Sequence, residues 1–173
     1  MKPELVPHVT KDDILLGTVE RAQAYKEGLV HRAAHAFIRN SEGLFLLQQR
    51  SQTKSAWPNL TDLSLGETVQ PEESYVDAFR RGAREELGAE VSNIELIRER
   101  YYQEYFWKDY KAFVVVCLYL ATVTQELNFF DGEVASASWL TEEQVSEYLD
   151  EHPENCTPWL LADWKYAITR NVF

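Results

Sequence analysis

The chain is poor in cysteine and short of positive charge. Two of its 173 residues are cysteines, and Cys117 and Cys156 have neither the CxxC spacing nor the spacing of a metal site. We therefore expect reduced thiols rather than a disulfide. Basic side chains number 17 against 28 acidic ones, which gives a formal net charge of −11. This charge argues against a nucleic-acid polymer or an anionic membrane as the main partner.

Long hydrophobic runs are also missing. No stretch approaches the roughly 20 apolar residues that a membrane span needs, and the N-terminus does not place a basic flank before an apolar run, as a secretory signal does. These absences predict a cytoplasmic protein. The chain has no internal repeat, no low-complexity segment and no second-domain boundary. We therefore expect residues 1–173 to form one domain with its own core.

The most informative stretch is residues 65–91, which predicts an amphipathic helix. Pro71 suits a first helical position and Gly88 suits a helix end. Glu85 and Glu86 project together from one turn of this helix. Such a pair suits a hard divalent cation, although adjacent glutamates are also typical of a solvated acidic face. The apolar side chains of the helix recur at helical spacing, at Val76, Phe79, Ala83 and Leu87.

Residues 66–88 resemble the Nudix box, whose family pattern is G-x5-E-x7-R-E-U-x-E-E-x-G-U, with U an aliphatic residue. Two positions depart from this pattern. Glu67 stands where the box opens with glycine, one residue after Gly66, and Gly82 stands where the box has a glutamate. The residues that match the pattern are Glu73, Arg81, Ala83, Glu85, Glu86, Gly88 and Ala89.

The resemblance implies a role for each charged position of the box. Glu86 and Glu85 would bind Mg²⁺, or Mn²⁺ in its place, and Glu85 would also belong to the catalytic group. Arg81 would form a structural salt bridge with Glu73. The glutamate that is missing at position 82 helps to bind the metal in the family. In some members it is also the general base, a role that contributes about 10²–10⁴ in rate.

Two other acids are candidates for the missing function. Glu133 matches the place where many Nudix enzymes keep an additional acid on a loop that faces the metal, and we expect it to be the proton acceptor. Glu67, in the turn before the helix, is the second candidate. A general base must lie within hydrogen-bond reach of the attacking water, which limits the choice to acids near the metal-facing side of the helix.

The segment 50–59, RSQTKSAWPN, is similar to the branch of the Nudix superfamily that includes isopentenyl-diphosphate isomerase. In that enzyme an arginine and a lysine with this spacing contact the substrate diphosphate, which implies the same role for Arg50 and Lys54. Taken alone, both would be interpreted as surface charges, and we expect the Arg50 head group to be solvated. The positions of the isomerase's own catalytic residues are occupied here by Leu65, Glu67, Phe113 and Val115.

The rest of the chain predicts an α/β protein. The N-terminal extension, residues 1–30, contains apolar segments at 6–10 and 14–19 that are consistent with a hairpin, followed by a short helix at 20–27. The resemblance implies the Nudix α/β/α sandwich with a mixed β-sheet and this N-terminal β-hairpin extension. Further strands are expected at 31–40, 44–50, 93–107 and 111–122, the last of them central and buried.

Three further residues carry local predictions. His35 is interpreted as a packed, hydrogen-bonded core histidine rather than a ligand. Thr141 is a plausible N-cap of a helix, with Glu143 as its capping-box partner.

The resemblance implies a metal-dependent hydrolase of a diphosphate linkage, in a nucleoside diphosphate derivative or a related small diphosphate. Two alternatives stay open. Gly82 favours a catalytically weak or silent Nudix domain that only binds its ligand. An isomerase like isopentenyl-diphosphate isomerase is the other alternative, and the loss of that enzyme's catalytic residues argues against it.

Overall fold

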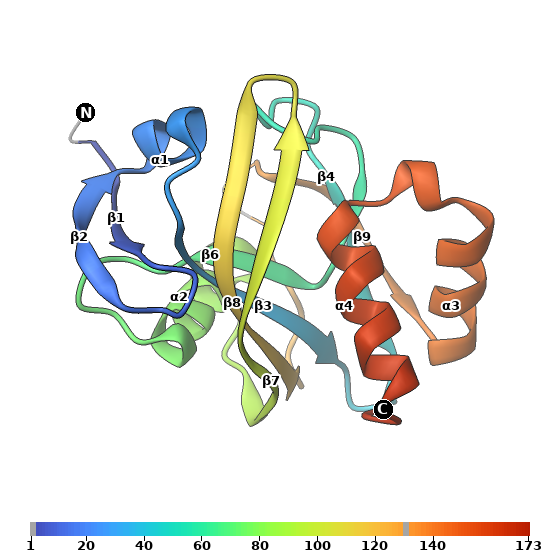
Figure 1. Ribbon diagram of the computed structural model, residues 1–173. Helices are drawn as coiled ribbons and strands as arrows, with labels where there is room; N and C mark the ends of the chain where they lie inside the picture. The colour runs from blue at the N-terminus through green and yellow to red at the C-terminus, as the bar shows by residue number, and fades with distance from the viewer. Residues whose placement is uncertain (1–2, 130–131) are drawn as a thin grey trace.

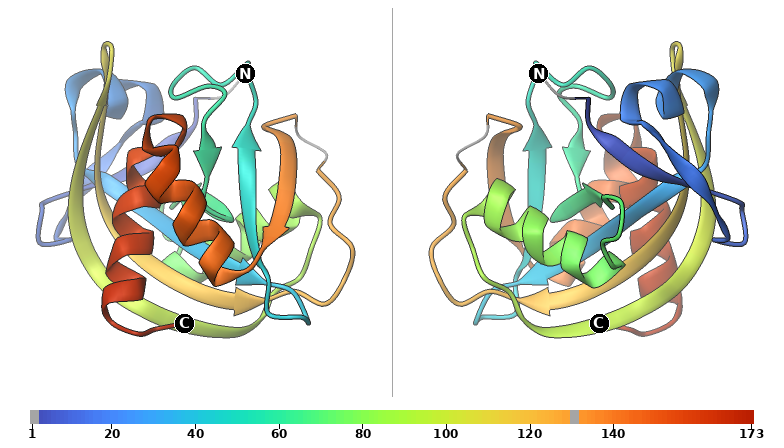
Figure 2. Two further views of the ribbon diagram at one scale, coloured as in Figure 1. Left: turned by 90° about the vertical axis from the view of Figure 1, so that its right-hand side faces the viewer. Right: turned by 90° about the vertical axis from the view of Figure 1, so that its left-hand side faces the viewer.

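The structure is a computed structural model, which describes residues 3–129 and 132–173. A mixed β-sheet lies between helix α2 (Tyr75–Leu87) on one face and helices α3 (Glu142–Glu151) and α4 (Pro158–Thr169) on the other (Figures 1 and 2). The predicted α/β/α sandwich is therefore confirmed. Within the described ranges, no helix is long and apolar enough to cross a membrane.

Strand β3 organises the sheet, because it pairs with four other strands. It runs antiparallel to β1, β4 and β6 and parallel to β8, which makes the sheet mixed. Strand β2 extends the sheet beyond β1, β7 extends it beyond β8, and β5 and β9 pair with β4. The strands are β1 (Leu5–Val9), β2 (Leu15–Glu20), β3 (His31–Arg39), β4 (Phe45–Arg50), β5 (Thr61–Asp62), β6 (Leu65–Thr68), β7 (Ser92–Trp107), β8 (Tyr110–Thr122) and β9 (Val134–Leu140).

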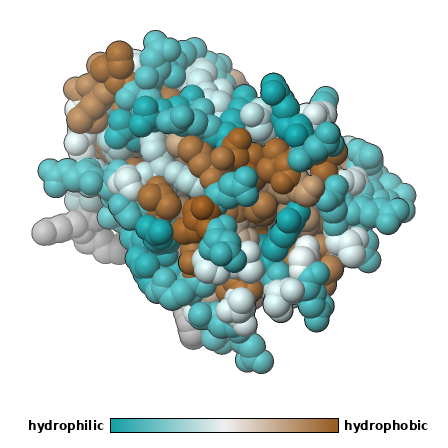
Figure 3. Space-filling view, turned by 90° about the horizontal axis from the view of Figure 1, so that it is seen from below, coloured by the Kyte–Doolittle hydropathy of each residue, from teal (hydrophilic) through white to brown (hydrophobic). Residues whose placement is uncertain are grey.

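The predicted N-terminal hairpin is formed by β1 and β2, and helix α1 (Arg21–Glu27) follows it. The hairpin buries Val6 and Val9. Other apolar side chains stay at the surface, and Figure 3 shows apolar residues gathered on the lower face of the molecule with polar residues around them. The large exposed hydrophobic residues are Leu5, Ile14, Leu15, Leu16, Leu96 and Phe106.

Strand β8 is central and buried, as its apolar run predicts. It lies between β3 and β7, and its side chains enter the two hydrophobic cores on the two faces of the sheet. Under α2, the ring of Phe79 stacks on Tyr119 with centroids 5.5 Å apart. On the opposite face, Phe37 meets Trp164 of α4 edge-on at 5.3 Å. Packing on both faces holds the sheet and α2 in a fixed relation.

Helix α2 begins later than its sequence suggests. Pro71 lies in a turn before the helix, and Ser74 is the N-cap, whose hydroxyl accepts a hydrogen bond from the Asp77 N–H. The side chain of serine satisfies a backbone donor at the helix start, which proline cannot do. The end of the helix is predicted correctly, because Gly88 adopts a left-handed φ of 60°, a conformation that favours glycine.

The capping box of α3 uses a different partner from the one that we expected. Thr141 is the N-cap, but its partner is Gln144 and not Glu143. The Gln144 N–H donates to the Thr141 hydroxyl, and the Gln144 side-chain oxygen accepts from the Thr141 N–H at 2.9 Å. The reciprocal bonds need the third residue after the cap, and Glu143 is the second.

Candidate active site

Arg81 of α2 is the centre of a group of acidic side chains. Its guanidinium is bidentate to Glu73, with Nε 2.9 Å from Oε1 and Nη2 3.0 Å from Oε2, and Nη2 also donates to the Thr68 carbonyl. Nη1 donates to Glu85 at 3.1 Å and forms an ion pair with Glu67 at 3.2 Å. The fork of arginine suits this geometry, because it presents several donors in one plane. One side chain thus joins α2 to β6 and to the turn between them.

Glu67 comes from β6 and lies against the middle of α2. Its side chain is only 14% exposed, and Oε1 also accepts from the Thr68 N–H at 2.9 Å. Burial raises the pKa of the Glu67 carboxyl, and Arg81 opposes this shift. A Cβ atom placed on Gly82 would lie 2.8 Å from the Glu67 Oε2. The two departures from the box pattern therefore contact each other.

The acids of the last turn of α2 differ in their exposure. The Glu85 side chain is 60% exposed and Glu86 is half-buried. Within residues 3–129 and 132–173, no three His, Cys, Asp or Glu side chains are already arranged around a metal position. Mg²⁺ usually takes one or two protein carboxylates together with water and substrate phosphate oxygens. Any one or two of the carboxylates of Glu67, Glu85 and Glu86 would therefore suit Mg²⁺ or Mn²⁺, with the remaining ligands left to water and substrate.

Two adjoining cavities lie beside this group. The larger has a volume of about 500 Å³ and the smaller about 130 Å³. Glu67 lines the smaller cavity and Glu133 the larger, so the two candidate proton acceptors lie on different walls. The side chains that line both cavities are Arg21, Tyr25, Lys54, Ser55 and Tyr110.

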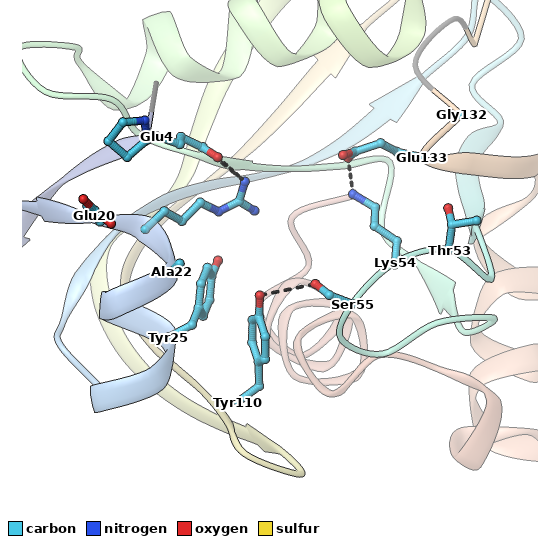
Figure 4. A pocket seen from close by; sticks show the side chains of 12 residues that line it. Glu4, Glu20, Ala22, Tyr25, Thr53, Lys54, Ser55, Tyr110, Gly132 and Glu133 are labelled. Atoms are coloured by element: carbon cyan, nitrogen blue, oxygen red, sulfur yellow. Dashed lines mark hydrogen bonds and ion pairs between the residues drawn. The ribbon is translucent and has the colours of Figure 1, made fainter. Parts of the chain in front are cut away.

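Lys54 and Glu133 meet across the larger cavity (Figure 4). The ammonium group of Lys54 pairs with the carboxylate of Glu133, and the Ser51 N–H donates to the Glu133 carbonyl at 2.8 Å. These contacts hold the segment before β9 against the loop after β4. The sequence predicts a catalytic role for one residue and phosphate binding for the other, and the structure brings the two together.

Arg50 is not the solvated loop cation that we expected. Its side chain is 17% exposed, and Nη1 pairs with Asp62 at 2.8 Å. Nε and Nη2 donate to the carbonyls of Trp57 and Ala56. Arg50 lines the smaller cavity, but these contacts make it part of the framework of the 51–60 loop.

Arg50→Ala should lower the free energy of unfolding by about 3 kcal/mol, because it removes the guanidinium that pairs with Oδ2 of the buried Asp62 and donates to two carbonyls. Urea denaturation of the variant measures this effect. Arg80→Ala is the matched control, because Arg80 is 47% exposed and lies 3.8 Å from its acidic partner, and its loss should change stability by less than about 1 kcal/mol. Equal stability of the two variants would contradict a framework role.

Sequence reasoning missed the contribution of the N-terminal extension. Arg21 and Tyr25 of α1 line both cavities, and Arg21 forms an ion pair with Glu4 at 2.9 Å. The rings of Tyr25 and Tyr110 lie 4.8 Å apart, and the Tyr110 hydroxyl contacts Ser55 (Figure 4). Arg21 and Tyr25 are four residues apart in α1, so they lie on one helical face. This spacing is the sequence feature from which their shared position could have been predicted.

His35 has the role predicted for it. It is 6% exposed, and its Nδ1 lies 2.7 Å from Asp163, whose other oxygen accepts from the Tyr101 hydroxyl. Cys117 and Cys156 are free and buried.

Comparisons with known proteins identify the family and the fold. A family model for the NUDIX domain matches residues 29–160. A Nudix hydrolase of Deinococcus radiodurans is 32% identical over 145 residues, which cover 79% of this chain and 78% of that protein. Isopentenyl-diphosphate Delta-isomerase 1 of Photorhabdus laumondii is 28% identical over 163 residues, 93% of each. The crystal structure of DR0079 from Deinococcus radiodurans superposes with a TM-score of 0.74 at 27% identity, over 94% of this chain and 98% of that one.

Proposed function

This chain belongs to the NUDIX domain family, and on that premise we propose that it hydrolyses a diphosphate linkage in a small molecule with the help of a divalent cation. Hydrolases of this family generally use divalent metals such as Mg²⁺ and act on small molecules. One observation carries the proposal for this chain. Glu67, held against α2 by Arg81, lines the same cavity as the cations Lys54 and Arg21.

The cavity walls support separate roles for acids and cations. Glu86 and Glu85 would hold Mg²⁺ or Mn²⁺, which when bound neutralises phosphate charge and lowers the pKa of a bound water. Lys54 and Arg21 would hold the phosphate oxygens, since both line the two adjoining cavities. Arg50 lines the smaller cavity with them and keeps its loop in place. This arrangement would leave a diphosphate between the acids of α2 and the larger cavity.

The larger cavity suits the organic part of the substrate. The paired rings of Tyr25 and Tyr110 form part of its wall, and aromatic faces of this kind pack against planar groups. This wall favours a nucleoside diphosphate derivative over a diphosphate that carries only a small aliphatic group.

Glu133 is the proposed proton acceptor for the attacking water. Lys54 pairs with its carboxylate, and a phosphate that draws Lys54 towards itself would release this carboxylate to accept a proton. Glu133→Gln should lower kcat by about 10² or more, while the affinity for Mn²⁺ changes little. Steady-state kinetics and a Mn²⁺ titration measure the two quantities. Normal turnover would defeat the assignment, and an equal loss of Mn²⁺ binding would make Glu133 a metal ligand.

The isomerase alternative has a specific observation in its favour, the 28% identity to isopentenyl-diphosphate Delta-isomerase 1. The residues at the catalytic positions of that branch oppose it. Leu65 and Val115 are fully buried and apolar, so neither can take or give a proton. We therefore place isomerisation below hydrolysis.

A substrate panel tests the proposed function. Nucleoside diphosphate derivatives and prenyl diphosphates are incubated with the protein and Mg²⁺ or Mn²⁺, and released phosphate and organic products are both measured. We expect a nucleotide to be hydrolysed, and we expect this hydrolysis to stop when a chelator removes the metal. Binding of one compound without turnover of any would make the protein a ligand-binding domain, and an isomerised prenyl diphosphate would make it an isomerase.

A further inference from the structure

The two departures from the box pattern are opposite substitutions. Position 67 has glutamate where the pattern has glycine, and position 82 has glycine where the pattern has glutamate. The two positions are far apart along the chain, one in β6 and one in α2. In the folded protein they are in contact, because a Cβ on Gly82 would meet three atoms of the Glu67 side chain at 2.8 to 3.1 Å.

This contact explains why α2 has glycine in its interior. Glycine is unfavourable in the middle of a helix relative to alanine, and Gly82 has no left-handed φ that would call for it. Real Cβ atoms do not approach other atoms as closely as 2.8 Å. A side chain at position 82 would therefore push Glu67 away from the helix, and the absence of a side chain lets Glu67 pack there.

The position of the Glu67 carboxylate is fixed on both sides. Arg81 and the Thr68 N–H hold Oε1, and Oε2 faces the helix surface at position 82. Arg81 connects the same carboxylate to Glu85 through Nη1. The carboxylate therefore lies beside the acids of α2, within the space that a side chain from position 82 would fill.

We propose that Glu67 supplies from β6 the carboxylate that the box pattern places at position 82, as an oxygen ligand of the divalent cation beside Glu86. This inference rests on the proposed function, because it assigns a ligand to the same metal site. It makes Gly82 a requirement for the site rather than a defect. It also means that restoring glutamate at position 82 alone harms the protein instead of improving it.

A double-mutant cycle of Glu67→Gly and Gly82→Glu tests the exchange. Mn²⁺ affinity, thermal midpoint and hydrolysis are measured for the wild type, both single variants and the double variant. Each single variant should bind Mn²⁺ about 10-fold more weakly or worse, and Gly82→Glu should also lower the midpoint by crowding two carboxylates. The double variant should recover most of the Mn²⁺ affinity and a higher midpoint than Gly82→Glu. A double variant no better than the worse single variant would overturn the proposal.

Two smaller changes keep the test decisive if a variant of the cycle folds poorly. Glu67→Gln keeps the size of the side chain, so Mn²⁺ affinity should fall about 10-fold while the protein stays folded. Unchanged affinity would make Glu67 only a structural partner of Arg81. Gly82→Ala should weaken Mn²⁺ binding and fail to raise the thermal midpoint, although alanine favours helices. A higher midpoint with unchanged affinity would overturn the contact argument.

The readouts separate this inference from the proposed function. Mn²⁺ affinity and thermal midpoint are measured without substrate, so the cycle gives an answer even if no diphosphate is hydrolysed. Recovery of Mn²⁺ binding in the double variant without any hydrolysis would support the exchange and refute the enzyme. Hydrolysis by the wild type, with no recovery of Mn²⁺ binding in the double variant, would support the enzyme and refute the exchange. A wild type that binds no Mn²⁺ would overturn the inference.

Discussion

Glu86→Gln is expected to lower kcat/KM by about 10²–10³, because a catalytic cation contributes several kcal/mol. Glu86 matches both the general box and the isomerase branch. It is half-buried next to the fully buried Leu87, where lower effective dielectric strengthens its attraction for a cation. Glutamine keeps the shape of the side chain and removes its charge, so Mn²⁺ affinity should fall with activity.

Two other glutamates serve as controls for Glu86. Glu85→Gln should have a smaller effect, because Glu85 is 60% exposed and already paired with Arg81. Glu90→Gln should have none, since Glu90 lies beyond the helix end, is 68% exposed and lies 3.6 Å from Arg84. Mn²⁺ titrations and steady-state kinetics of the three variants give the ranking. Unchanged Mn²⁺ affinity in Glu86→Gln would move the metal site elsewhere.

Arg81→Ala should lower the free energy of unfolding by about 3–5 kcal/mol, the largest loss of stability expected for any variant proposed. The side chains of Glu73 and Glu67 are only 15% and 14% exposed, and both would keep a charge without their partner. Arg81→Lys should recover part of the loss, because lysine keeps the charge but not the bidentate geometry. Urea denaturation measures all three proteins.

The pH dependence of Arg81→Ala gives a second check. Burial already raises the pKa of Glu67, and removal of Arg81 should raise it further. The folded variant would then bind a proton more readily than its unfolded chain, so its stability should increase as pH falls from 7 towards 5. Arg84→Ala, at a side chain that is 51% exposed, should show neither effect. Equal losses in the two variants would contradict the central position of Arg81.

Local features of the fold could be predicted from the sequence because their causes are local. Gly88 ends α2 with a backbone conformation that glycine adopts readily, and the apolar run of β8 requires burial on both faces. The prediction that α2 begins at Pro71 is wrong, because a proline that suits the first turn of a helix also suits a turn before the helix. Helix α2 begins after Ser74, because the Ser74 hydroxyl accepts a hydrogen bond from the Asp77 N–H. Residue types alone do not show whether this bond forms.

The site could be predicted in its parts but not in its contacts. The box pattern identifies Glu73, Arg81 and the acids of α2, because their spacing lies within one segment. The burial of Arg50 depends on its ion pair with Asp62 of β5. No local sequence pattern predicts this pair. The contact of Glu67 with Gly82 likewise exists only after β6 has paired with β3 and α2 has packed beside it.

The most direct measurement is a ³¹P NMR time course on metal-free protein and the best diphosphate of the panel, with Mg²⁺ then added back. We predict that the substrate signals stay constant without metal, are converted to those of hydrolysis products after Mg²⁺ is added, and persist when Glu86→Gln replaces the wild type. Hydrolysis that proceeds equally in the metal-free protein, or substrate that binds with Mg²⁺ and is never cleaved, would contradict a metal-dependent hydrolase.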